Sequence, residues 1–258
     1  SPIFLLGTGR SGTTLIQRIL NTYPDTIIWG EHAGCLDNLS KAYYTLTENP
    51  SMEVYSYAEN AKYEASLTLD FFKGPAKWQA WNNWFDREAV RQIFRQQLEA
   101  IFNPDRFSRH PNWGFKEIRY GRGDRVLDFL LELYPTARFL FVVRNGFNTV
   151  ESQLNTFHQG ESRFLTIKRL IQLPLALRIA KGWARQNKAF YDFSLKHKEN
   201  ALFFRYEDVI SDAFHLGEML NFLGKSITQE QRDILSLRAG RGSSFDVDTS
   251  EKERWKRL

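Results

Sequence analysis

The segment Gly7–Thr14, with the sequence GTGRSGTT, brings glycines, hydroxyl side chains and one arginine together in a single short loop. It follows the apolar run Ile3–Leu6, which is typical of a buried parallel strand, and it precedes a helical pattern that starts at Leu15. A helix that begins at such a loop presents unpaired backbone N–H groups and the positive end of its dipole, and glycines allow an anion to approach the main chain. We call this segment the phosphate loop and predict that it binds an anion.

The phosphate loop shares part of a known nucleotide-binding pattern. Gly7 and Gly12 have the separation of a Walker A motif, and Thr14 supplies its last hydroxyl, but Thr13 stands where that motif has lysine. The missing lysine counts against a P-loop nucleotide kinase or NTPase, which stays the alternative. GTGRSGTTL instead resembles the 5′-phosphosulfate loop of sulfotransferases that use 3′-phosphoadenosine 5′-phosphosulfate (PAPS). The arginine before Ser-Gly-Thr-Thr is most like the tyrosylprotein sulfotransferases and related bacterial enzymes.

A second resemblance follows the apolar run Ala137–Val143, which predicts a central strand. Arg144 comes directly after this run, and Ser152 lies eight positions later on a predicted helix. The pair resembles the 3′-phosphate site of sulfotransferases, where a planar guanidinium and a hydroxyl reach one phosphate. Asn145 departs from the aspartate that is usual after the arginine, and Thr156 departs from a basic residue seen in some relatives.

Two further segments complete the resemblance. FRYEDV, after the predicted strand Ala201–Phe204, is similar to an element whose tyrosine approaches the adenine of PAPS, and Tyr206 is the match; a purely structural tyrosine is the alternative. GRGSSF resembles a glycine- and cation-containing loop that closes over the 3′-phosphate, although a solvated terminal segment fits the sequence equally well. The resemblance therefore implies that PAPS contacts these residues: Gly9, Arg10, Ser11, Gly12, Thr13, Thr14, Arg144, Ser152, Tyr206, Arg241, Gly242 and Ser243.

A carboxylate follows the second predicted strand, Thr26–Trp29. Ligands collect beyond the carboxyl ends of parallel strands, so Glu31 is expected in the same crevice as the phosphate loop. We predict Glu31 as the general base that takes the proton of an acceptor hydroxyl, and a capping or solvent-facing glutamate is the structural alternative. His32 is the second candidate base because imidazole titrates nearer neutrality. On a strand end the two side chains should point in opposite directions.

A lysine ends the third predicted strand, Trp113–Ile118. In tyrosylprotein-type sulfotransferases a lysine in a similar place is associated with the transferring sulfuryl group, and Lys116 is the match. The resemblance implies that Arg10, Lys116 and the amides of residues 11 to 14 stabilise negative charge as it develops on the leaving phosphate. A surface lysine or an ion-paired lysine is the alternative for Lys116.

The order of apolar segments predicts the fold class. Five short apolar runs separated by helices predict an α/β, three-layer P-loop-type fold with a central parallel sheet of about five strands and helices on both faces. We expect residues 1–258 to form a single domain, with an aromatic-rich helical insertion or cap at residues 36–112. Its aromatic side chains either line an acceptor cleft or pack the cap onto the core, and we expect packing for most of them.

Composition limits the remaining functions. The 258 residues carry a net charge of +5, which suits an anionic ligand but is too weak to indicate nucleic-acid binding. Cys35 is the only cysteine, so an internal disulfide is impossible and a reducing, cytoplasmic location is expected. No run of about 18 apolar residues could span a bilayer, and the five histidines form no metal-ligand pattern, so no metal is expected.

The sequence leaves the acceptor open among protein tyrosine, glycan hydroxyl and small alcohol, because the matched residues are mostly those of the donor site. A catalytically silent nucleotide-binding or scaffold protein could keep the same fold. The presence of Glu31, Arg10 and Lys116 argues against that reading.

Overall fold

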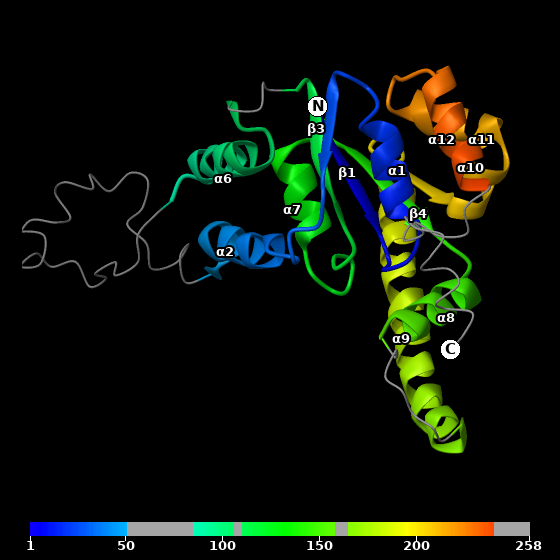
Figure 1. The fold of residues 1–258 in the computed structure, drawn as a ribbon. Helices are drawn as coiled ribbons and strands as arrows, with labels where there is room; N and C mark the ends of the chain where they lie inside the picture. Colours follow the sequence, from blue (N-terminus) through cyan, green and yellow to red (C-terminus); the bar gives the residue numbers. More distant parts are fainter. Residues whose placement is uncertain (51–84, 106–109, 158–164, 240–258) are drawn as a thin grey trace, which may run out of the picture.

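A computed structural model describes residues 1–50, 85–105, 110–157 and 165–239 (Figure 1). The strands of the described part are β1 (Pro2–Gly7), β2 (Thr26–Trp29), β3 (Asn112–Glu117), β4 (Arg138–Val143) and β5 (Ala201–Arg205). The helices are α1 (Thr13–Leu20), α2 (Leu36–Glu48), α6 (Arg87–Phe102), α7 (Val126–Leu133), α8 (Gly146–Phe157), α9 (Leu165–Lys196), α10 (Tyr206–Ser211), α11 (Ala213–Phe222) and α12 (Gln229–Ala239).

The five strands form one sheet in the order β2-β3-β1-β4-β5, and every neighbouring pair is parallel. The predicted fold class, a parallel five-stranded α/β sheet covered by helices, is therefore confirmed. Parallel neighbours require crossover connections, and these are the helices that leave the carboxyl end of one strand and return to the amino end of another. Because β1 is central, the phosphate loop that follows it lies near the middle of the carboxyl edge.

The alternation of side chains along β1 explains the two helical layers. Phe4 and Leu6 pack in a core that includes residues of α2, α6, α7 and α9, whereas Ile3 and Leu5 pack in a second core with residues of α1, α10 and α11. Figure 1 shows α2, α6 and α7 on one side of the sheet and α1, α10 and α11 on the other. All four side chains are at most 2% exposed, which is why β1 reads as a continuous apolar run.

The described part of the predicted insertion packs on the first core. Tyr43 of α2 is fully buried against Phe94 of α6 and Phe129 of α7, with ring centroids 5.4 and 5.3 Å away. Offset and edge-to-face aromatic pairs of this kind add to the free energy gained by burying apolar area. Structural packing is thus the role of this aromatic residue, as expected for most of the insertion.

Two element boundaries differ from the sequence expectation. A helix predicted to begin at Pro174 and to end at Leu195 begins at Leu165, so that the proline lies inside α9. Tyr206, which we expected just after a strand end, is the first residue of α10. Proline is favoured at a helix start but is also accommodated inside a helix at the loss of one backbone hydrogen bond. None of the helices described here has the length and apolar character needed to cross a bilayer.

Candidate functional site at the carboxyl edge of the sheet

The phosphate loop connects β1 to α1 in a strained backbone conformation. Arg10 has φ 68° and Gly12 has φ 93°, both in the left-handed region. Only Gly12 lacks a Cβ there, and a Cβ at that position would lie 2.2 Å from the Tyr206 ring. Tyr206 therefore packs directly on the loop, and glycine is required at residue 12 by both backbone conformation and space.

Two buried hydroxyl groups of the loop have no hydrogen-bond partner in the described structure. These are Thr8 Oγ1 and Ser11 Oγ, and their residues are 2% and 0% exposed. No side chain caps the amino end of α1 at Gly12 either. Buried polar groups without partners are rare in proteins, and clusters of them mark places where a ligand or an ion completes the hydrogen bonding. The loop thus has the donor groups that a phosphate or sulfuryl oxygen requires.

Arg10 joins the loop to the two predicted 3′-phosphate residues. Its Nε donates to Ser152 Oγ at 2.9 Å, and Arg144 Nη1 donates to the Arg10 carbonyl oxygen at 3.2 Å. Burial, and then the charge of Arg144, lower the pKa of the Arg10 guanidinium. The structure therefore brings Arg10, Arg144 and Ser152 together and holds two cations close to each other, an arrangement that an anion would stabilise.

The departure at Asn145 leaves this region intact. Asn145 Oδ1 accepts hydrogen bonds from the backbone N–H groups of Phe147 at 3.0 Å and Asn148 at 3.3 Å, at the start of α8. An aspartate would use its carboxylate oxygen in the same way, because both residue types are good helix caps. The Arg144 carbonyl oxygen also accepts from Trp183 Nε1 at 3.2 Å, which ties this strand end to α9.

Glu31, after β2, meets the side chains of two cations from the β3 end. Lys116 Nζ lies 2.7 Å from Glu31 Oε1, and Arg119 Nη1 lies 3.0 Å from Oε2. Lys116 Nζ also donates to Thr14 Oγ1 at 3.3 Å, so that one ammonium group links the carboxylate to the phosphate loop. The structure places Glu31, Lys116 and Thr14 together, as strand order and the carboxyl-edge rule predict.

Glu117 and Arg119 lie at the candidate site but were not predicted from the sequence. The Glu117 carboxylate is fully buried and accepts from the N–H groups of His32, Gly34 and Ile118 and from Arg119 Nη1. Burial acts to raise the pKa of Glu117, but these hydrogen bonds outweigh it, so the pKa is lowered. We call Glu31, Lys116, Glu117 and Arg119 the carboxylate cluster. Its one sequence signal was a second charged residue, Glu117, directly after Lys116.

The His32 side chain contacts other residues than Glu31 does. Its Nε2 bonds to the Tyr120 hydroxyl, and its ring packs edge-on against Phe115 with centroids 4.5 Å apart. Burial is the largest cause that lowers the pKa of His32, which favours neutral imidazole. The enclosure by aromatic rings makes His32 a part of the core and a poorer candidate for proton transfer than Glu31.

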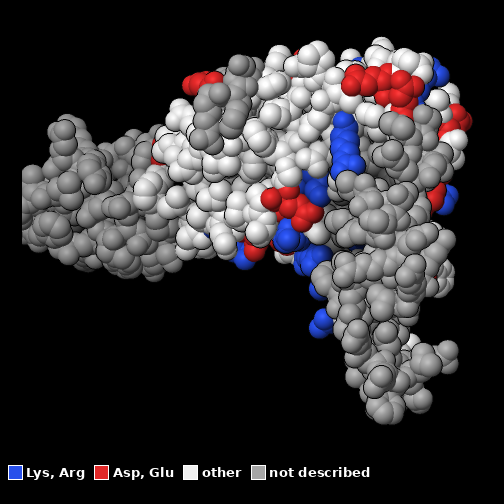
Figure 2. All heavy atoms as spheres, in the orientation of Figure 1, with Lys and Arg blue, Asp and Glu red and all other residues white. Residues whose placement is uncertain are grey.

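Of the remaining residues predicted to bind PAPS, some are described by the structure and others are not. Thr13 is buried at the start of α1, and Gly9 accepts a hydrogen bond on its carbonyl oxygen from Gln153 Nε2 at 2.9 Å. Arg241, Gly242 and Ser243 lie outside the described residues. Figure 2 shows lysine and arginine side chains gathered near the carboxyl end of the sheet, with a small acidic group among them. Among the described residues, no group of three or more potential metal ligands is found.

Comparison with known proteins gives one match over most of the chain. A family model described as the sulfotransferase family matches residues 2–229. A search of curated protein sequences gave no significant match.

Solved structures were compared by fold. The sulfotransferase domain of the Synechococcus PCC 7002 olefin synthase superposes with a TM-score of 0.53 and 20% identity, over 91% of this chain and 77% of that one. The sulfotransferase domain from the curacin biosynthetic pathway gives 0.49 and 17%, over 89% and 75%. Mouse sulfotransferase SULT7A1, complexed with PAP, gives 0.49 and 12%, over 91% and 63%. At 20% identity, the similarity to the olefin synthase domain establishes the fold alone.

Proposed function

This chain belongs to the sulfotransferase family, and we propose that it transfers a sulfuryl group from PAPS to the hydroxyl group of an acceptor. The observation that carries the proposal is the phosphate loop, where buried hydroxyls without partners lie beside two arginines and next to a lysine–glutamate pair. PAPS supplies the activated sulfuryl group. The acceptor stays open among protein tyrosine, glycan hydroxyl and small alcohol.

The donor would be held by residues that already lie together. Ser11 Oγ and the amide groups at the start of α1 suit the oxygens of the 5′-phosphosulfate. Arg144 and Ser152 suit the 3′-phosphate, and both already contact Arg10. Tyr206 lies against Gly12 with the Arg144 guanidinium 5.4 Å from its ring centre, which favours a place for the ring beside the nucleotide.

In the transfer step the acceptor oxygen forms a bond to sulfur while the bond from sulfur to the bridging phosphate oxygen breaks. The electron pair of the broken bond leaves with 3′-phosphoadenosine 5′-phosphate (PAP), and the acceptor proton passes to the Glu31 carboxylate. A carboxylate is a weak base toward an alcohol, so proton removal must accompany the formation of the new bond. Arg10 and Lys116 stabilise the charge that develops on the leaving oxygen.

Lys116 is placed to link the two halves of this step. Its ammonium group contacts both Glu31 and Thr14, and its side chain is only 10% exposed. When negative charge builds on the leaving phosphate oxygen, Lys116 can donate to it without a large movement, because Thr14 belongs to the phosphate loop. Arg119 remains on the other oxygen of Glu31 and keeps that carboxylate in position.

The first test is Glu31→Gln, which keeps the shape of the side chain and removes its basicity. We expect the rate of transfer of labelled sulfate from PAPS to a panel of phenols, sugars and alcohols to fall about 100-fold or more. PAP affinity, measured by calorimetry, should stay nearly unchanged. Glu48→Gln, at an ion-paired glutamate of α2, is the matched control. Normal turnover in Glu31→Gln would remove this residue from the mechanism.

The second test concerns the donor. Arg144→Ala and Ser152→Ala should each weaken PAP binding, by about tenfold or more for the arginine, because each removes a hydrogen bond to a charged phosphate. Isothermal calorimetry measures the effect without any acceptor. If both variants bind PAP with the affinity of the unmodified protein, the 3′-phosphate site lies elsewhere.

A further inference from the structure

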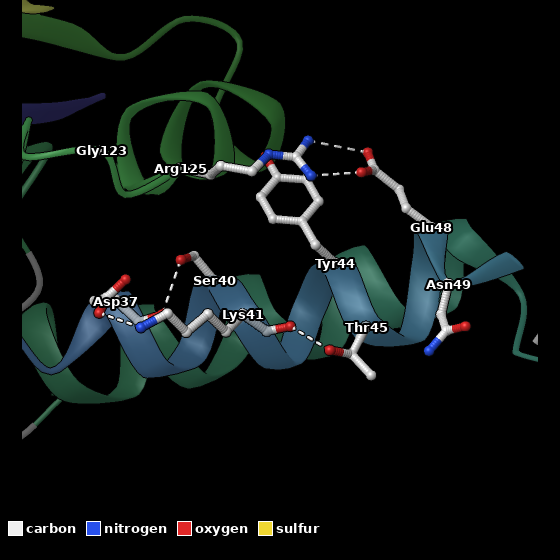
Figure 3. A pocket seen from close by; sticks show the side chains of 9 residues that line it. All are labelled: Asp37, Ser40, Lys41, Tyr44, Thr45, Glu48, Asn49, Gly123 and Arg125. Carbon is white, nitrogen blue, oxygen red and sulfur yellow. Dashed lines mark hydrogen bonds and ion pairs between the residues drawn. The ribbon is translucent and has the colours of Figure 1, made fainter.

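Two cavities of similar size lie near the carboxyl edge, and their charges differ. The first, of about 480 Å³, lies between α2 and the segment before α7 (Figure 3). Arg125 lies over the Tyr44 ring there, 3.4 Å from its centre, and pairs with Glu48 at 2.5 Å. Lys41 pairs with Asp37 at 2.6 Å. Each of the charged residues named as lining this cavity pairs with a residue of opposite charge. Their charges balance, so they give no preference for an anionic or a cationic ligand.

The second cavity, of about 410 Å³, has unbalanced charge. Among the described residues, Arg122, Arg178 and Arg185 line it and no aspartate or glutamate does. Within the same part of the chain, none of the three arginines forms an ion pair with a carboxylate. Arg122 Nε donates to the amide oxygen of Gln186 at 3.3 Å, and its Nη2 donates to the Ile118 carbonyl oxygen at 3.4 Å, so both partners are uncharged. We call this cavity the arginine pocket. Three cations around one cavity raise the local concentration of an anion.

The arginine pocket adjoins the phosphate loop, and most of the residues assigned to PAPS do not line it. Thr8 and Gly9 of the phosphate loop line it, together with Gln153, which follows Ser152. Tyr206 lies against Gly12, at the other end of the loop. Arg122 lies three residues beyond Arg119, whose guanidinium contacts Glu31. The pocket thus lies beside the phosphate loop, and one of its arginines follows the segment whose Arg119 contacts the proposed base.

The walls of the arginine pocket suit a small molecule with an apolar body. The indole of Trp183 and the side chain of Ile179 line it beside the arginines. Its volume lies within the range of pockets for small ligands. Its described lining is more polar than is usual for such pockets, because three arginines and two glutamines contribute to it. A long peptide is not needed to fill it.

From this geometry we propose that the acceptor is a small hydroxyl compound that also carries a carboxylate or another anionic group, which the arginine pocket binds. The proposal rests on the proposed function and names its substrate class. The anionic group pairs with the arginines, the apolar body lies on Trp183, and the hydroxyl points past Gly9 toward the sulfuryl group. The transfer step is the one given above, and the anionic group takes no part in it.

The test compares matched acceptors on the protein saturated with PAP. Two pairs of probes differ only in charge: 4-hydroxyphenylacetate with 4-hydroxyphenylacetamide, and 4-hydroxybutyrate with 4-hydroxybutyramide. Calorimetry should show that at least one carboxylate binds about tenfold more tightly than its amide. The preference should shrink when ionic strength is raised from about 0.1 M to about 1 M. Equal affinities in both pairs, or no carboxylate binding, would overturn the proposal.

The triple variant Arg122→Gln, Arg178→Gln, Arg185→Gln should lose the preference and keep its PAP affinity, because all three residues are exposed and none is assigned to the donor. Lys181→Gln is the control, since Lys181 is an exposed cation of α9 that does not line the pocket. If the triple variant instead loses PAP affinity, these arginines bind the donor and the acceptor assignment is wrong.

The outcome separates this inference from the proposed function. Transfer of labelled sulfate from PAPS to the amides as efficiently as to the carboxylates would overturn the inference and leave the proposed function standing. Arginine-dependent carboxylate binding without transfer to any acceptor would overturn the proposed sulfuryl transfer. The arginine pocket would then be an anion-binding site and not an acceptor site.

Discussion

The phosphate loop and the carboxylate cluster adjoin each other at one edge of the sheet, yet they are completed in opposite ways. In the loop, Thr8 Oγ1 and Ser11 Oγ are buried without a hydrogen-bond partner among the described residues. In the cluster, both oxygens of Glu117 and both oxygens of Glu31 are engaged by N–H groups or by cations. The loop is therefore incomplete without a ligand, whereas the cluster is complete by itself.

This difference indicates how the two regions contribute to a reaction. The phosphate loop holds its donor groups in a strained backbone conformation. A bound ligand would form the hydrogen bonds that its buried hydroxyls lack and would offset the free energy lost when they were removed from water. The cluster uses a buried carboxylate, Glu117, to hold Arg119, and Arg119 in turn holds Glu31. We infer that the phosphate loop binds the ligand and that the carboxylate cluster holds Glu31 in position.

The largest effect on stability is expected at Gly12, where the phosphate loop has no room for a side chain. Gly12→Ala forces a left-handed backbone on alanine and places a Cβ 2.2 Å from the Tyr206 ring. We expect a loss of about 3 kcal/mol in the free energy of unfolding, measured with urea, and loss of detectable PAP binding. In a Tyr206→Ala background the same substitution should cost only about 1 kcal/mol, because the clash is gone and the backbone strain remains.

A second glycine supplies the control for this prediction. Gly217 lies inside α11, where an added Cβ would meet nothing within 4 Å. Gly217→Ala should stabilise the protein by about 0.5 to 1 kcal/mol, because alanine is the better helix former. An equal loss in both variants would show that the loop geometry at Gly12 is not the cause.

A somewhat smaller effect is expected in the carboxylate cluster. Glu117→Gln keeps the volume but turns an amide group toward N–H donors and leaves Arg119 without its buried partner. Arg119 is 44% exposed and keeps Glu31 as a partner, so the cost is below that of breaking a fully buried ion pair and amounts to about 2 kcal/mol. We expect that loss in urea unfolding, together with lower sulfuryl transfer and unchanged PAP affinity. A loss of PAP binding equal to the loss of transfer would show that the two regions are not separate.

The same variant gives a pH test with a definite sign. The pKa of Glu117 is lowered in the folded protein, so its contribution to stability is present above the unfolded value of 4.5 and is lost as pH falls through the folded pKa. The stability difference between the unmodified protein and Glu117→Gln should therefore be largest at neutral pH and should shrink below pH 4.5. A difference that is constant with pH would contradict the ionised, hydrogen-bonded Glu117.

The sequence predicts the loop better than the cluster, and the reason is physical. The residues of the phosphate loop are contiguous, and glycines with hydroxyls between a strand and a helix have one dominant use. Glu31 and Arg144 were found because each follows a strand, and Lys116 because it lies near the end of one, since parallel strands end at the same edge. For these positions, local pattern and topology were sufficient.

The contacts of Glu117 could not be predicted from local pattern and topology. Its partners are the N–H groups of His32 and Gly34, which follow a different strand, and a contact of this kind depends on the register of β2 with β3. Arg119 likewise acts through a bend after β3 that brings it back to Glu31. Residues that act by positioning others carry no motif, since their partners are set by tertiary structure.

The smallest effect on stability, and the sharpest test of the comparison, is Ser11→Ala. Ser11 Oγ is buried without a partner, so its removal takes away a group that folding has stripped of water and has not compensated. We expect the free energy of unfolding to stay unchanged or to rise by up to about 1 kcal/mol. PAP affinity should fall about tenfold, because the hydroxyl finds its partner only in the complex. Ser40→Ala is the control: Ser40 is buried too, but its hydroxyl already donates to the Asp37 carbonyl oxygen, so PAP affinity should not change. If Ser11→Ala destabilises the free protein and leaves PAP binding intact, the loop is already complete without a ligand and differs from the carboxylate cluster only in composition.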